Sequence, residues 1–305
     1  MAFPRKRESL MTNVEPKYML SQLLVRQAMR RIATSIRVGT TIEEAVRCSI
    51  KNKISGIVAT DLSFAPLGVV SKTDIVSAYY AGIPIDSPVE TIMSTPPICC
   101  APEDSLDHVL GIMREKGIHR LYVVDKDRAA GTGVISYSDI VGLLYRCCHK
   151  CERNLKGKML SDDADSADLV RVREIMTPSV LTIEEYATLY EVIEALCQHR
   201  FGAILITWSG HPAGVVSKTD LILAYRHRVP ATAMARSIMR SPVRSCDEND
   251  ELARVIQQMI FRDIKRFFVY KGDPDEIVGV ISLTDAAQAR SGSCRACMPS
   301  RIEVL

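Results

Sequence analysis

Four copies of a short polar motif carry the residue types that can bind a phosphorylated ligand. They are the segments Gly68–Asp74 (Gly-Val-Val-Ser-Lys-Thr-Asp), Gly133–Asp139, Gly214–Asp220 and Gly279–Asp285. Each runs from an apolar strand pattern into a helix start, where the serine and the aspartate three residues later can form a reciprocal capping box. Free amide donors and the positive end of the helix dipole favour a phosphate at the same place. The motif therefore predicts a helix cap in every copy, and a phosphate site as the functional alternative.

Two Cys-x-x-Cys pairs are the second chemically informative feature, and they lie at equivalent places in the chain. Cys148 follows Asp139 by nine residues, and Cys294 follows Asp285 by the same interval. Thiolates at this spacing are typical ligands of tetrahedral zinc and of iron–sulfur clusters. We expect one metal centre of zinc or an iron–sulfur cluster, with the ligands Cys148, Cys151, Cys294 and Cys297. Thiol–disulfide exchange and inert reduced thiols are the alternatives.

The spacing of the motifs shows that the chain is a duplication within a duplication. Asp74 and Asp139 are 65 residues apart, and each has a counterpart 146 residues later, in Asp220 and Asp285. Other residues that keep the 146-residue interval are Gly56 and Gly202, Tyr79 and Tyr225, Met93 and Met239, and Arg120 and Arg266. A unit of about 60 residues was therefore doubled twice.

The second unit shows most clearly which elements must position the motif. Leu106, Val109, Leu110 and Met113 fall on one helical face, so a helix is predicted over 105–116, and Gly117 ends it. Short strands are predicted near residue 98, over 121–124 and over 133–136, and a second helix over 138–146. The order strand-helix-strand-strand-helix indicates a small α/β unit.

These repeats resemble the cystathionine-β-synthase (CBS) domain family. Besides the polar motifs, the resemblance rests on Ile-Met sequences that end in proline before repeats two, three and four, in the segments Ile92–Pro96, Ile175–Pro178 and Ile238–Pro242. A degenerate Ala28-Met29 version without the proline lies in the first repeat. The resemblance implies an α/β fold whose four repeats pair into two pseudo-symmetric modules that form a disc. It leaves open whether like or unlike repeats of the two modules meet.

The repeats account for nearly the whole chain. We expect a disordered N-terminus over 1–20, CBS repeats over 21–85, 86–148, 169–231 and 232–293, a polar linker over 149–168 and a C-terminal tail over 294–305. No fused catalytic, transporter or DNA-binding segment is expected.

The resemblance also implies a ligand and its binding residues. Adenine nucleotides bind CBS proteins in the clefts between paired repeats, where aspartates accept the ribose hydroxyls and basic pairs face the phosphates. The matching aspartates are Asp74, Asp139, Asp220 and Asp285; the neighbouring hydroxyls are Ser71, Thr73, Ser136, Ser138, Ser217, Thr219, Ser282 and Thr284; the basic pairs are His119–Arg120 and Lys265–Arg266. For the basic pairs, a solvated strand entrance is the alternative.

Composition narrows the function classes. The 305 residues carry 39 Lys and Arg against 36 Asp and Glu, and this net charge of +3 is no electrostatic signature of nucleic-acid or membrane binding. No apolar run is long enough for a transmembrane helix, and no secretory signal begins the chain. Neither a catalytic triad, a paired-carboxylate motif nor a Walker loop occurs. We therefore expect a cytoplasmic protein that is not an enzyme.

Together with the resemblance, these features favour a regulatory sensor that binds AMP, ADP or ATP and acts by conformational change on an unidentified protein partner. S-adenosylmethionine and dinucleotides are alternative ligands, and a homodimer is an alternative to a monomer. The competing interpretations are a metal- or redox-sensing protein built around the cysteines, and a structural scaffold whose clefts stay empty.

The cysteine interpretation predicts metal in the purified protein. Protein isolated without chelator should contain zinc or iron near one equivalent per four-cysteine site, because four thiolates close a tetrahedral shell. A Cys151→Ser, Cys297→Ser variant should lose it. Elemental analysis of both proteins measures this. Metal-free wild-type protein with four freely titrating thiols at these positions would contradict the prediction.

Overall fold

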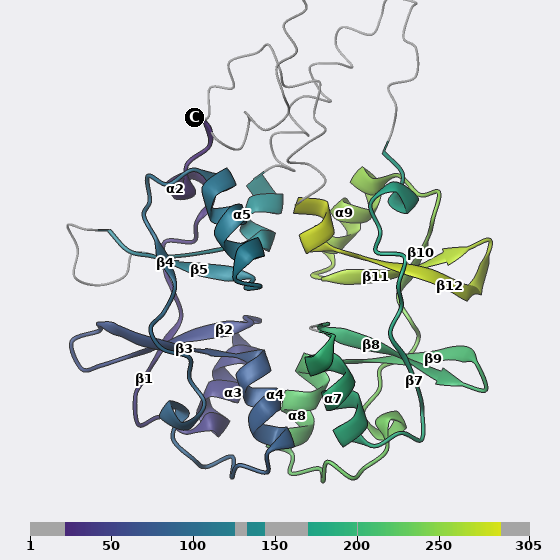
Figure 1. Cartoon of the computed structure of the whole chain (residues 1–305), viewed down its shortest axis with the longest axis horizontal. Coiled ribbons are helices and arrows are strands. Elements are labelled where there is room, and N and C mark those ends of the chain that lie inside the picture. Colours follow the sequence, from purple (N-terminus) through teal and green to yellow (C-terminus); the bar gives the residue numbers. More distant parts are fainter. Residues whose placement is uncertain (1–21, 126–132, 144–169, 200, 288–305) are drawn as a thin grey trace, which may run out of the picture.

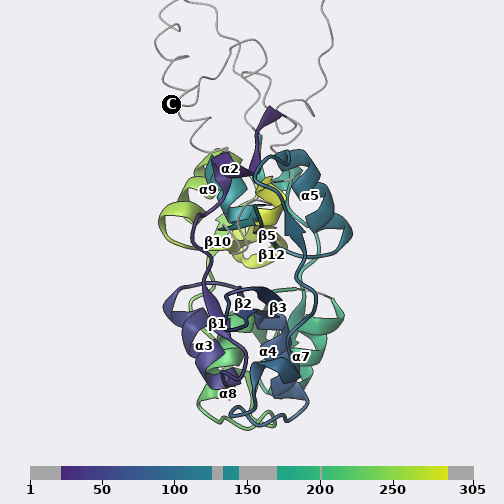
Figure 2. The same cartoon turned by 90° about the vertical axis from the view of Figure 1, so that its left-hand side faces the viewer.

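The computed structural model describes residues 22–125, 133–143, 170–199 and 201–287, and it shows four small α/β repeats arranged as a disc (Figure 1). Each repeat contains one three-stranded sheet. Seen from the side, the disc is narrow and has two tiers (Figure 2). The predicted fold class is thereby confirmed. No helix among the described residues has the length and apolarity needed to cross a lipid bilayer.

The same order of elements recurs in every repeat. Repeat 1 contains α2 (Val25–Ala28), β1 (Ser35–Arg37), α3 (Ile42–Lys51), β2 (Gly56–Thr60), β3 (Pro66–Ser71) and α4 (Lys72–Tyr80). Repeat 2 contains η1 (Val89–Thr91), β4 (Cys99–Cys100), α5 (Leu106–Glu115), β5 (Arg120–Val123), β6 (Gly133–Ser136) and helical residues 137–143. Repeat 3 contains η2 (Val172–Glu174), β7 (Thr182–Glu184), α7 (Leu189–Gln198), β8 (Ala203–Trp208), β9 (His211–Ser217) and α8 (Lys218–Arg226). Repeat 4 contains η3 (Ala235–Ser237), β10 (Ser245–Asp247), α9 (Leu252–Phe261), β11 (Arg266–Lys271), β12 (Asp273–Ser282) and helical residues 283–287.

Local sequence explains where the helices begin. The Ser105 hydroxyl accepts a hydrogen bond from the His108 amide, so α5 starts one residue later, at Leu106. Leu106, Val109, Leu110 and Met113 are all buried, as their helical spacing predicts. In each sheet the first strand pairs in parallel with the second, and the second pairs antiparallel with the third.

The structure corrects one equivalence expected from the sequence. The Lys72 amide donates to the Ser55 carbonyl, whereas the Lys218 amide donates to the Gly202 carbonyl. Gly202 is therefore the counterpart of Ser55, not of Gly56. The mismatch arises because the hairpin loop of repeat 3 is one residue shorter than that of repeat 1. Thr60 pairs with Pro66, whereas the equivalent Thr207 pairs with Pro212.

Like repeats of the two modules lie side by side. In Figure 1, repeats 1 and 2 form one half of the disc and repeats 3 and 4 the other, with α4 next to α8. The rings of Tyr79 and Tyr225 stack with centroids 5.1 Å apart, and the Tyr79 hydroxyl donates to the Val229 carbonyl at 2.6 Å. One apolar core joins repeats 1 and 3, and another joins repeats 2 and 4. The two modules thus share their cores.

Within a module, the chain entering each repeat crosses to the sheet of its partner. We call residues 29–31, 93–95, 176–178 and 239–241 the crossing segments. Their central residues pair antiparallel with the third strand of the partner repeat, in the bridges Arg30–Val134, Ser94–Val69, Thr177–Val280 and Arg240–Val215. A module therefore has interlocked rather than separate repeats.

The first glycine of each polar motif makes this crossing possible. A Cβ atom on Gly133 would lie 2.2 Å from the carbonyl oxygen of Arg30, and one on Gly68 would lie 2.9 Å from that of Ser94. A Cβ atom on Gly214 would lie 3.0 Å from the carbonyl oxygen of Arg240, and one on Gly279 would lie 2.9 Å from that of Thr177. Glycine is required at these positions because two backbones meet there.

Replacing Gly133 should therefore destabilise the fold. Gly133→Ala should lower the free energy of unfolding by about 1–3 kcal/mol, because the crossing backbone must move. Gly111→Ala is the control: it lies in α5 with open space around its Cβ position, and should stabilise by about 0.5–1 kcal/mol through helix propensity. Denaturant unfolding measures both. Equal effects of the two substitutions would contradict the role of the crossing.

Candidate functional site

The predicted capping box is complete in repeats 1, 3 and 4. In repeat 2 the Ser136 amide and hydroxyl both donate to Asp139, but the return bond from the Asp139 amide is not among the hydrogen bonds of the described residues. The Ser71 amide donates to Asp74 Oδ2 at 2.7 Å, and the Asp74 amide donates to the Ser71 hydroxyl at 3.2 Å. The backbone amides of Ser136, Ser217 and Ser282 donate to Oδ2 of Asp139, Asp220 and Asp285 at 2.9, 2.9 and 2.7 Å. The cap occupies one carboxylate oxygen, Oδ2, and leaves the other, Oδ1, for a different partner.

The second carboxylate oxygen has unlike surroundings in the four repeats. Arg30 Nε donates to Asp139 Oδ1 at 2.8 Å, and Arg240 Nε donates to Asp220 Oδ1. The corresponding oxygens of Asp74 and Asp285 accept no hydrogen bond from any residue that the structure describes. Two of the four aspartates thus keep an available acceptor.

Two lysines that the sequence analysis did not select link the modules at the disc centre. Lys72 Nζ donates to the Thr219 hydroxyl at 2.7 Å, and Lys218 Nζ donates to the Thr73 hydroxyl at 2.9 Å. These contacts are reciprocal and join the first turns of α4 and α8. The signal for them was present, since lysine follows the motif serine in repeats 1 and 3 only.

The basic pairs approach the neighbouring repeat of the same module. Arg120 Nη1 donates to the Gly56 carbonyl at 2.6 Å, and its Nη2 donates to the Ser55 hydroxyl at 3.2 Å. Arg266 lies against Gly202, where a Cβ would come within 2.4 Å of its Nη2. Loss of hydration lowers the pKa of both arginines, which are half-buried, whereas His119 and Lys265 of the same pairs are exposed.

The remaining predicted hydroxyls belong to the same helix starts. Ser136 and Ser138 share a hydrogen bond at 3.0 Å between their hydroxyl oxygens. The Ser282 hydroxyl donates to Asp285 at 2.6 Å, and Thr284 lies in the first turn of helical residues 283–287. The His119 ring packs edge-on to Tyr137, with centroids 5.8 Å apart.

Six basic side chains from all four repeats act on one another at the disc centre. We call this set the central cations: Lys72, His119, Arg120, Lys218, Lys265 and Arg266. Loss of hydration and the charge of Lys265 lower the pKa of Lys72 to about 8. Loss of hydration and the charge of Lys218 lower the pKa of His119, although its ring keeps a solvent-exposed face. Such mutual repulsion favours binding of an anion between the groups.

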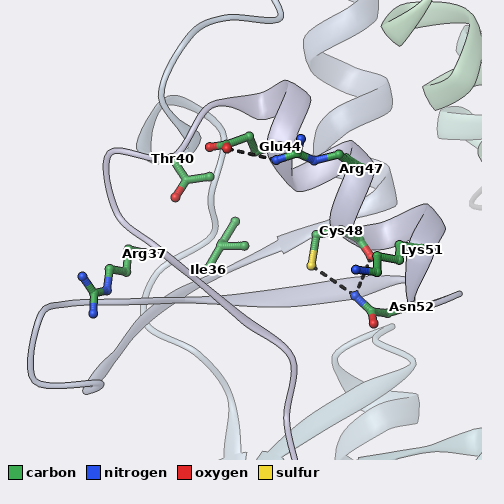
Figure 3. A pocket seen from close by; sticks show the side chains of 8 residues that line it. All are labelled: Ile36, Arg37, Thr40, Glu44, Arg47, Cys48, Lys51 and Asn52. Atoms are coloured by element: carbon green, nitrogen blue, oxygen red, sulfur yellow. Dashed lines mark hydrogen bonds and ion pairs between the residues drawn. The ribbon is translucent and has the colours of Figure 1, made fainter.

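A surface hollow lies elsewhere, on repeat 1. It has a volume of about 580 Å³ on the outer side of repeat 1 and is lined by Ile36, Arg37, Thr40, Glu44, Arg47, Cys48, Lys51 and Asn52 (Figure 3). Arg47 is paired with Glu44 at 3.1 Å, and Asn52 Nδ2 donates to the Cys48 carbonyl at 3.0 Å. None of the predicted binding residues lines it.

The predicted cysteine ligands Cys148, Cys151, Cys294 and Cys297 lie outside the described residues. Among the residues that are described, no group of three or more His, Cys, Asp or Glu side chains is placed to hold a metal. Burial raises the pKa of Cys100 and Cys246 to about 12, so these thiols are inert apolar groups near neutral pH.

Comparison with known families gives a match to the CBS domain over residues 25–81, 89–146, 172–227 and 235–292. The crystal structure of protein MJ1225 from Methanocaldococcus jannaschii, described as a proposed archaeal homologue of γ-AMPK, has a TM-score of 0.71 to this chain at 18% identity. The alignment covers 88% of this chain and 99% of that one.

Two further proteins are similar to the chain. An uncharacterized conserved protein from Pyrococcus horikoshii has a crystal structure with a TM-score of 0.57 at 17% identity, covering 88% of this chain and 100% of that one. A 33.4 kDa protein in a ribosomal RNA operon of Thermofilum pendens is 20% identical over 181 residues, 59% of this chain. The chain spans 57% of that relative's length. At these identities the two structural likenesses concern the fold alone.

The central cations predict proton-coupled anion binding. Inorganic pyrophosphate should take up protons when it binds between about pH 8 and 10.5, because Lys72 is partly neutral there and a bound anion favours its charged form. Affinity should accordingly fall as pH rises through this window. Calorimetry in buffers of different ionisation enthalpy measures the uptake. Lys72→Met should reduce it and the exposed Lys51→Met should not; binding without proton uptake would contradict the prediction.

Proposed function

The chain belongs to the CBS domain family, and on that premise we propose that it is a regulatory protein that binds an adenine nucleotide between paired repeats and passes the bound state to a protein partner. AMP, ADP and ATP share the groups that the proposal needs: a ribose with two hydroxyls and at least one phosphate. The cysteine site predicted from the sequence is independent of this proposal.

The central cations are the observation that carries the proposal. Lys72, His119 and Arg120 lie in one module, and Lys218, Lys265 and Arg266 occupy the equivalent places in the other. In Lys72, Arg120 and Arg266, loss of hydration is the largest cause of the lowered pKa. A purely structural centre would gain stability from apolar side chains instead. Phosphate groups would supply the missing negative charge, since arginine and lysine pair with them through charge-assisted hydrogen bonds.

The capping geometry leaves one oxygen of the aspartate carboxylate to accept a hydrogen bond from the sugar. Asp285 uses Oδ2 for the cap with Ser282, so Oδ1 remains to accept a ribose hydroxyl. The negative charge of Asp285 acts on Arg266, and this supports assigning the two side chains to the ribose and the phosphate of one nucleotide. We assign Asp285 to the ribose and Arg266 to the phosphate on this basis.

Binding of a phosphate would change the lysine–threonine contacts that join the two modules. Lys72 and Lys218 hold the Thr219 and Thr73 hydroxyls of the opposite module. A phosphate that attracts these ammonium groups competes with the threonines, so the bound and free states differ in how α4 and α8 are held together. A partner that contacts both modules would respond to that difference through its unequal affinity for the two states.

The proposal predicts a phosphate-dependent effect of Arg266. Arg266→Ala should weaken AMP binding about 10- to 100-fold, as expected for about 1.5–3 kcal/mol from a charge-assisted hydrogen bond. Adenosine, which has no phosphate, should lose little affinity. Calorimetric titration with both ligands measures the ratio.

Arg262→Ala is the matched control, because Arg262 lies exposed at the end of α9 and is not one of the central cations. A folding defect would weaken both ligands alike, so the ratio of the two affinities separates it from a binding role. Equal losses for AMP and adenosine in Arg266→Ala would contradict the assignment. Absence of binding by every adenine nucleotide at millimolar concentration would overturn the proposed function.

A further inference from the structure

The crossing segments place unlike side chains beside the four aspartates. Each central residue pairs with the partner's third strand, so its side chain starts from an equivalent backbone position in all four repeats. At Asp139 and Asp220 that residue is arginine, Arg30 and Arg240 respectively. At Asp74 and Asp285 it is the short, neutral Ser94 or Thr177.

The two arginines occupy the acceptor that a ribose would need. The side chain of Asp139 is 11% exposed and that of Asp220 is 5% exposed, whereas Arg30 and Arg240 are 47% and 67% exposed. Each arginine therefore reaches from solvent onto a dehydrated carboxylate. Because the cap already holds Oδ2, a sugar hydroxyl that binds the aspartate must compete with the arginine at Oδ1.

The cleft beside Arg30 has little space while the arginine is in place. The cavity there measures about 20 Å³, which is room for about one water molecule, whereas small-molecule pockets measure about 300–1,000 Å³. Arg30, Arg120, Tyr122 and Val134 are among its lining residues.

Two polar groups in this cleft have no partner. Arg120 Nε and the Tyr122 hydroxyl are buried and make no hydrogen bond in the described structure. Buried polar atoms are normally satisfied, so these atoms suit a polar ligand for which the present cleft has no room. The cleft has the chemistry of a binding site in a closed form.

We propose that Arg30 and Arg240 close two of the four clefts, so that each module binds one nucleotide, at Asp74 in the first and at Asp285 in the second. This inference rests on the proposed function. Asp74 belongs to repeat 1 and Asp285 to repeat 4, which lie at opposite corners of the disc (Figure 1). AMP binds at the arginine-paired clefts at least about tenfold more weakly, because it must break a charge-assisted hydrogen bond there.

Equilibrium dialysis of the full chain with AMP tests the inference. Wild-type protein should have two tight AMP sites per chain, with any further binding weaker. Asp74→Asn and Asp285→Asn should each remove one of the two tight sites. Arg30→Gln and Arg240→Gln should each add a tight site. Glutamine is shorter than arginine and neutral, so it lacks the charge-assisted hydrogen bond that closes the cleft. Thermal melting checks that each variant is folded.

Arg26→Gln is the control, since Arg26 lies in α2 four residues before Arg30 and approaches Glu103 only at 3.9 Å. It should leave the number of bound AMP at two. Four tight sites in wild-type protein would overturn the inference, as would an unchanged or lowered number in folded Arg30→Gln and Arg240→Gln. Those results leave the proposed function standing. If neither wild-type protein nor the arginine variants bind AMP, ADP or ATP, the proposed function fails as well.

Discussion

The close approach of two backbones at four glycines is the constraint on which the rest of the molecule depends. At Gly133 the crossing segment comes so near that a single Cβ atom would meet the Arg30 carbonyl. This contact aligns the repeat that donates the segment with the sheet that receives it. The same exchange continues upstream, where the Val25 amide donates to the Asp104 carbonyl ahead of α5. A repeat is therefore completed by its partner, whose crossing segment pairs with the sheet edge formed by the third strand.

The same constraint fixes which side chain of the crossing segment lies near each capping aspartate. The residue that pairs with the third strand lies beside the capping aspartate that follows this strand. Its side chain decides whether the aspartate has a charged neighbour, as with Arg240 at Asp220, or a small neutral one, as with Thr177 at Asp285. One backbone architecture thus yields clefts of different chemistry with a change of one side chain in each.

At the disc centre, basic side chains lie where their charges are unfavourable to one another. Loss of hydration is the largest cause of the lowered pKa of Lys72 and of Lys218, and the charges of Lys265 and Arg266, respectively, add to it. The contacts of these lysines with Thr219 and Thr73 offset only part of that cost. The apolar cores on either side, including the stacked Tyr79 and Tyr225, hold the modules together in spite of it.

The sequence by itself determined the repeats, the order of their elements and the bond from each motif serine amide to the aspartate that caps it. The Ser71–Asp74 cap spans three residues, and the helix from Leu106 follows from an apolar spacing, so both depend on neighbours along the chain. Only the tertiary structure decided that like repeats pack together and that Lys72 contacts Thr219 of the opposite module. It also decided which aspartates pair with arginine, since Arg30 and Asp139 are separated by 109 residues. Such contacts are set by how the sheets dock, and a spacing of three or four residues carries no information about them. The same limit explains the incorrect match of Gly56 with Gly202, because a hairpin one residue shorter changes the register without changing the motif at its end.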